Sequence, residues 1–164
     1  MRTRDDFRRL MAELAVDMET LAILFDKNRT MTERLEHGAD TEFDYAALGY
    51  TLHNLYCCQE NYFLRVAKFF ENGLDPATWH RDLIDRMVVE IPGLRPRLLD
   101  RDLAGRLDEL RGFRHRFRNV YQSSLDPERI RVLNGKVPGL VADFRTTHGA
   151  FLATLEYLAA GLQG

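Results

Sequence analysis

The segment TEFDYAALGYTLHNLYCCQENYFLRVAKFFEN, residues 41–72, decides the fold, because its apolar side chains return at helical spacing over its whole length. One stripe is formed by Leu48, Leu52, Leu55, Tyr62, Val66 and Phe69, and it is broadened by Tyr56, Phe63 and Phe70. A helix with so wide an apolar face is expected in a central position. The pattern therefore predicts a long central helix over residues 41–72.

The rest of the chain also shows helical periodicity. A long helix is predicted from Asp5 to Leu35, ended by Gly38, and a shorter one opens at Asp75-Pro76 and runs through Trp79 to Glu90. Asp100 caps a fourth helix that runs to about Tyr121. Asp126-Pro127 opens a short turn of helix to Leu133, Asn134-Gly135 interrupts it, and the last helix follows Pro138 and ends near Gly161.

No segment alternates with a period of two, so the predicted fold is all-α. Short connections favour antiparallel neighbours in an up-and-down bundle, with two long N-terminal helices and three or more shorter ones. The 164 residues, 45% apolar and 29% charged, are expected to form a single domain over 1–164. This composition argues against disorder and against a solenoid.

Composition also limits the function. No apolar run approaches the roughly 20 residues of a membrane-spanning helix, and the N-terminus lacks the apolar core of a signal peptide, so a cytoplasmic protein is expected. The two cysteines, Cys57 and Cys58, are adjacent and match no zinc-site spacing. A net charge of -2 does not indicate a generally basic nucleic-acid binder, so any basic site must be local.

One such site is the segment RGFRHRFRNVY, residues 111–121. At about 100° per residue, Arg111, Arg114 and Arg118 share one flank beside the apolar stripe, with His115 next to them. Guanidinium groups bind phosphate, and an imidazole can move the 2′-hydroxyl proton of RNA, which needs no metal. The alternative is a solvated helix face whose arginines are neutralised by nearby acids: Asp102, Asp108, Glu109 and Glu128.

The segment FRHRFRNVY (113–121), followed by LDPER (125–129), resembles the HepT-like branch of the HEPN superfamily. The segment WHRDL (79–83) and the preceding pair of long helices fit the same pattern. The resemblance implies a small all-helical homodimer that cleaves RNA without metal or other cofactor, as a toxin. It also implies a minimal nucleotidyltransferase antitoxin as partner, which in some systems adenylylates a tyrosine of the motif.

The family signature is an arginine, four to six residues, a histidine, and commonly a tyrosine two positions further on. Arg114 and Tyr121 match it, and Tyr121 is the candidate modification site, but Asn119 occupies the histidine position. Asparagine is neither a general acid nor a general base, although its amide can orient a phosphate or a 2′-hydroxyl. His115, one turn earlier, is the candidate replacement, with Arg111 or Arg118 as its phosphate partner.

Two functions therefore stay open. The first is a metal-independent endoribonuclease in which Arg114, Asn119 and His115 act on RNA held by Arg111 and Arg118. The second is a catalytically inactive relative that binds RNA or a nucleotide, or docks its nucleotidyltransferase partner.

Other candidate residues carry weaker signals. His53 and Glu60 lie seven residues apart on one helix face, so they could reach an active site or bind a metal, although a plain surface position is the simpler interpretation. A bundle metal site drawn from His53, His80 and His148 is a rival without supporting ligand spacing. His148 falls on an apolar stripe and is expected to be a packed core histidine.

Overall fold

The structure is a computed structural model that describes residues 2–71, 79–119 and 124–162; for residues 79–81 only the backbone is described. Within these ranges the chain forms five helices and no strand, which confirms the predicted all-α class. The helices are α1 (Arg4–Glu36), α2 (Glu42–Phe70), α3 (Trp79–Val88), α4 (Arg101–Phe117) and α5 (Pro127–Ala160).

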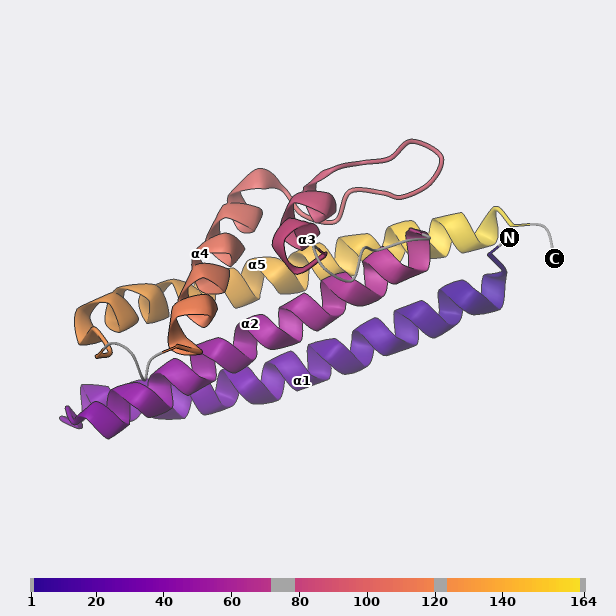
Figure 1. The fold of residues 1–164 in the computed structure, drawn as a ribbon. Helices are drawn as coiled ribbons and strands as arrows, with labels where there is room; N and C mark the ends of the chain where they lie inside the picture. The colour runs from indigo at the N-terminus through magenta and orange to yellow at the C-terminus, as the bar shows by residue number, and fades with distance from the viewer. Residues whose placement is uncertain (1, 72–78, 120–123, 163–164) are drawn as a thin grey trace.

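Helix α2 is the centre of the bundle, as its wide apolar face predicted. It contacts all four of the other described helices. Figure 1 shows α1 and α2 running antiparallel along each other, α5 extending beside them, and α3 and α4 on the side of α2 away from α1. One apolar core therefore extends along α2 and draws on every described helix.

The helix starts follow from local side-chain chemistry. Thr3 and Thr41 each form a reciprocal capping box with the carboxylate three residues later, Asp6 and Asp44. Asp100 caps α4 by accepting a hydrogen bond of 2.8 Å from the backbone of Leu103, as predicted. Helix α1 ends just before a glycine with a φ of 97°, Gly38, which is the predicted left-handed stop.

The prediction of two separate C-terminal helices was wrong. Helix α5 runs unbroken through Asn134, Gly135 and Pro138, and with 34 residues it is the longest of the described helices. The reason is tertiary: the buried amide of Asn134 accepts a hydrogen bond from Asn28 (2.8 Å) and donates one to Thr32 (2.9 Å), both on α1. These contacts hold the helix together where the local sequence favours a break.

Three predicted helix ends were also displaced. Helix α3 ends at Val88 and not at Glu90. Helix α2 ends at Phe70 and not at Asn72, and α4 ends at Phe117, short of Tyr121. Just after α4 the side-chain amide of Asn119 donates to the carbonyl of His115 at 3.1 Å, and its backbone N–H donates to the carbonyl of Arg116 instead. The side chain thereby takes the acceptor that a continuing helix would use. The predicted helix start at Asp75-Pro76 lies outside the described residues.

In the described part of the chain, no helix has the length and apolar character that crossing a membrane requires.

Candidate functional site

The three arginines that share a flank in the sequence have different surroundings in the structure. Arg114 reaches across to α2, where its Nη1 donates to Oε1 of Glu60 at 3.2 Å. Arg111 bends back to Asp108 on its own helix, with 2.7 Å between Nε and Oδ1. Arg118 lies in the turn after α4 and is exposed. Arg114 is therefore fixed between two helices, whereas Arg111 and Arg118 lie at the surface.

The Arg114 contact is a partly buried ion pair. The side chain of Glu60 is 9% exposed and that of Arg114 is 19% exposed. The guanidinium also stands over the ring of Tyr56, 5.7 Å from its centre, a cation–π contact. Burial raises the pKa of the Tyr56 hydroxyl, so this group is neutral beside the arginine. Glu60 and Tyr56 thus hold Arg114 in one orientation.

His53 lies on the same face of α2, one turn before Tyr56. Its ring lies 5.8 Å from that of Phe117 at the end of α4. Burial lowers the pKa of His53, and the positive charges of Arg114 and Arg118 lower it further. Among the described residues its Nδ1 has no hydrogen-bond partner, while Nε2 lies 3.5 Å from the sulfur of Cys57. His53 is therefore a neutral imidazole near two arginines at neutral pH.

A glycine lets α4 approach α2 this closely. A Cβ on Gly49 would lie 2.8 Å from the Phe117 ring and 3.3 Å from the Phe113 ring. These two rings stack on each other with their centres 5.6 Å apart. The absent side chain at position 49 thus makes room for the end of α4, and this packing positions Arg114 opposite Glu60.

His115 and Asn119 do not join Arg114. Both are exposed, and Asn119 lies in the turn after α4, where its amide bonds to the His115 carbonyl. Neighbouring residues on a helix point about 100° apart, so His115 faces away from the α2 side to which Arg114 points. Within one chain the basic segment therefore divides into an anchored arginine and an exposed histidine–asparagine pair.

The interpretation of His53 and Glu60 as surface residues was wrong, because both face α4. The signal that could have found them was their spacing, which puts them on one face with Tyr56. His148 is a hydrogen-bonded core histidine, as predicted, with its Nδ1 2.9 Å from the Tyr62 hydroxyl. Tyr121, the candidate modification site, lies outside the described residues.

A metal site finds no support in the described residues. No group of three or more histidine, cysteine or acidic side chains there could hold a metal ion, and the side chain of His80 lies outside that part. Cys57 and Cys58 are free cysteines and half-buried. Burial raises the pKa of the Cys58 thiol to about 11, so it is not a reactive thiolate.

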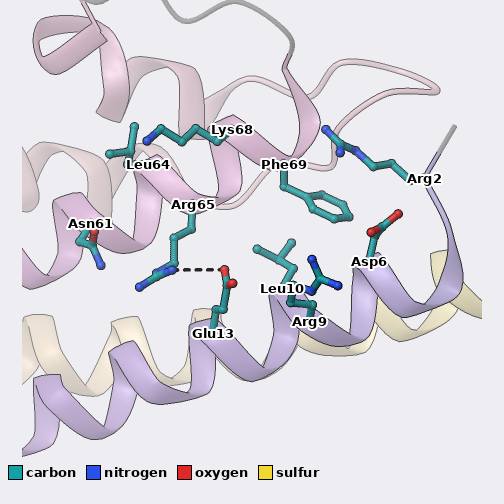
Figure 2. Close-up of a pocket in the computed structure, with 10 residues that line it drawn as sticks. All are labelled: Arg2, Asp6, Arg9, Leu10, Glu13, Asn61, Leu64, Arg65, Lys68 and Phe69. Carbon is teal, nitrogen blue, oxygen red and sulfur yellow. Dashed lines mark hydrogen bonds and ion pairs between the residues drawn. The ribbon is translucent and has the colours of Figure 1, made fainter.

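A charged cleft between α1 and α2 was missed in the sequence. Figure 2 shows Arg65 of α2 pointing at Glu13 of α1, with 3.2 Å between them. The Nε of Arg65 also donates to the buried carboxylate of Asp17 at 2.8 Å. These partners lie about 50 residues apart in the chain, so no local pattern announces them. These ion pairs link α1 to α2 on the side of α2 away from Arg114.

The fold and site define a class: a small helical bundle in which the basic end of one helix is anchored to a buried carboxylate on the central helix. Within that class the chain belongs to the HepT-like protein family, whose model matches residues 47–155, from early α2 to late α5. This match confirms the resemblance to the HepT-like branch of the HEPN superfamily. No curated protein and no solved structure matches the chain significantly.

Proposed function

We propose that this protein is a HepT-like toxin that cleaves RNA without a metal. The observation that carries the proposal is the anchored Arg114, which is held by Glu60 and Tyr56 while its side chain stays 19% exposed. A fixed guanidinium is suited to bind a phosphate and to stabilise the extra negative charge of the transition state. The half-buried Arg111 and the exposed Arg118 add positive charges for the neighbouring phosphates.

In this proposal His53 supplies the base that Asn119 cannot. Its lowered pKa keeps the imidazole neutral at neutral pH, so it can accept the proton of the 2′-hydroxyl. The 2′ oxygen then forms a bond to phosphorus, the bond to the 5′ oxygen breaks, and that oxygen takes up a proton from water. Asn119 lies with His115 away from Arg114, so its amide orients the 2′-hydroxyl only if a second chain brings it to the RNA. His115 takes the role of base only if a second chain brings it to the RNA.

The remaining parts of the proposal come from the family. They are a cytoplasmic homodimer, a minimal nucleotidyltransferase antitoxin as its partner, and Tyr121 as the tyrosine that this partner adenylylates. A homodimer would bring two sets of arginines to one RNA strand. Co-expression with a minimal nucleotidyltransferase, followed by mass spectrometry of the peptide that contains Tyr121, tests the partner and the modification together.

Cleavage of a labelled RNA by the purified protein in EDTA tests the activity. Arg114→Ala is expected to lower the rate by about 100- to 1,000-fold, because it removes one preorganised charge from the transition state. His53→Gln is expected to lower it by about 100-fold or more. Arg116→Ala, which removes an exposed arginine from the other side of α4, is the matched control and should leave the rate unchanged. Cleavage that survives both Arg114→Ala and His53→Gln would refute this assignment.

A second function is favoured by Asn119 itself. A relative without the family histidine can bind RNA or dock its partner without cleaving, since an asparagine amide still forms hydrogen bonds. In that case the purified protein binds RNA but does not cut it, and Arg114→Ala weakens the binding. Asn119→His separates the cases further, because a gain of cleavage would show an intact scaffold that lacks only its acid–base group.

A further inference from the structure

A second cavity lies at the end of the bundle where both termini of the described chain meet the end of α2. Its walls come from the start of α1, the end of α2, the end of α5 and the turn around Gly93, and Figure 1 shows these segments converging there. The cavity holds about 700 Å³, which is within the range of small-molecule sites. Its apolar wall includes Phe7, Phe69, Phe70, Ile91, Leu158 and Leu162.

One buried arginine, Arg95, lies among the apolar residues of this wall. The side chain of Arg95 is 1% exposed, and its Nε lies 3.0 Å from Oε1 of Glu71. Its Nη2 donates to the carbonyl of Arg86 at 2.5 Å. The contact between Nε and Oε1 of Glu71 is an ion pair without hydrogen-bond geometry, and within the residues that the structure describes the buried Nη1 has no hydrogen-bond partner. Buried donors are almost always paired in native proteins, so this one points to a missing acceptor.

The charges around Arg95 do not balance. Glu71 accepts from Arg86 as well as pairing with Arg95, so two guanidinium groups share one carboxylate. At the rim, Arg2 and Glu90 offset each other. Among the described charged residues of the cavity and its wall, one positive charge is therefore in excess. A ligand that completes this arrangement carries an oxygen acceptor and a single negative charge.

We propose that this cavity binds an apolar monocarboxylate, whose hydrocarbon or aromatic body packs against the phenylalanines and whose carboxylate accepts from Nη1 of Arg95. The guanidinium fork matches the geometry of a carboxylate. A phosphate monoester carries up to two negative charges and fits the single excess charge less well. The site is independent of the proposed RNA site, because Phe70 lies about 21 Å along α2 from Tyr56 at 1.5 Å per residue.

Three probes that share a naphthalene ring test which head group the cavity prefers: 2-naphthoate, 2-naphthol and 2-naphthyl phosphate. Each is titrated against the full chain by fluorescence at pH 7. We expect 2-naphthoate to bind at one site per chain and at least tenfold more tightly than the other two. Decanoate, with an aliphatic body, should displace it. Equal affinities for the acid and the alcohol, tighter binding of the phosphate, or no binding of either carboxylate would overturn the proposal.

Two substitutions in α5 test whether the probe binds in this cavity. Thr154 lines the cavity and Ala153 beside it is exposed outside it, so Thr154→Trp should weaken 2-naphthoate at least tenfold while Ala153→Trp should not. Arg95→Met, which keeps the length of the stem, should abolish the preference for the acid over the alcohol. If Arg95→Met does not fold, the Thr154→Trp result still decides. Binding that is unchanged by Thr154→Trp would show that the probe is elsewhere.

Discussion

The ion pair between Glu60 and Arg114 gives the sharpest test of the site. At 3.2 Å and an effective dielectric constant of about 20, two unit charges attract by roughly 5 kcal/mol before desolvation is subtracted. Breaking a fully buried pair costs about 3–5 kcal/mol, and the partial exposure of Arg114 lowers that figure. We therefore expect a coupling energy of about 2 kcal/mol in a double-mutant cycle of Glu60→Gln and Arg114→Met.

The cycle is measured by urea unfolding followed by circular dichroism at pH 7. The control is the more exposed pair of Arg111 and Asp108, with Arg111→Met and Asp108→Asn, whose coupling should stay below about 1 kcal/mol. The cycle cancels any other contact that Glu60 makes. A coupling for Glu60 and Arg114 no larger than the control would refute the view that the carboxylate anchors the arginine. The folded Glu60→Gln variant should also lose affinity for RNA.

Three further outcomes follow from the packing. Gly49→Ala should destabilise the fold by about 1–3 kcal/mol relative to Gly139→Ala in urea unfolding, because its Cβ meets Phe117 whereas position 139 is open; equal effects would contradict the close approach. Asn134→Ala should cost about 1–3 kcal/mol in the same assay, since its two partners on α1 lose a buried bond, and an unchanged stability would show that these bonds are not needed. Burial lowers the pKa of His148 in the folded state, so its contribution to stability is full above its unfolded pKa of about 6.5 and is lost as the pH drops through the folded pKa. His148→Gln should flatten that decline in stability. A wild-type stability that rises on acidification from pH 7 would contradict the assignment.

The site is shared between two helices, α2 and α4. Glu60, Tyr56 and His53 lie at successive turns of α2, and the end of α4 runs antiparallel to them. Arg114 therefore meets Tyr56 and Glu60 while Phe117, one turn later, meets His53. A single change in the packing of α4 would shift all of these contacts together.

The sequence by itself determined the helical class and the starts of α1, α2, α4 and α5. Periodic apolar residues identified α2 as the centre of the bundle, and the caps at Thr41, Asp100 and Asp126 follow from side chains that bond to the next turn of backbone. These are local interactions, within about four residues, so a sequence pattern can carry them. The family motif around Arg114 was likewise visible, because it is contiguous.

Only the tertiary structure decided the rest. The unbroken α5 depends on bonds from Asn134 to residues of α1 more than 100 positions away, which outweigh the local tendency of Asn-Gly and proline to interrupt a helix. The anchoring of Arg114 by Glu60 spans 54 positions. Arg111 and Arg114 share one flank on a helical projection, but only Arg114 meets a partner on another helix. Local sequence gives the direction of a side chain, while the charge and burial it encounters come from chain segments that folding brings beside it.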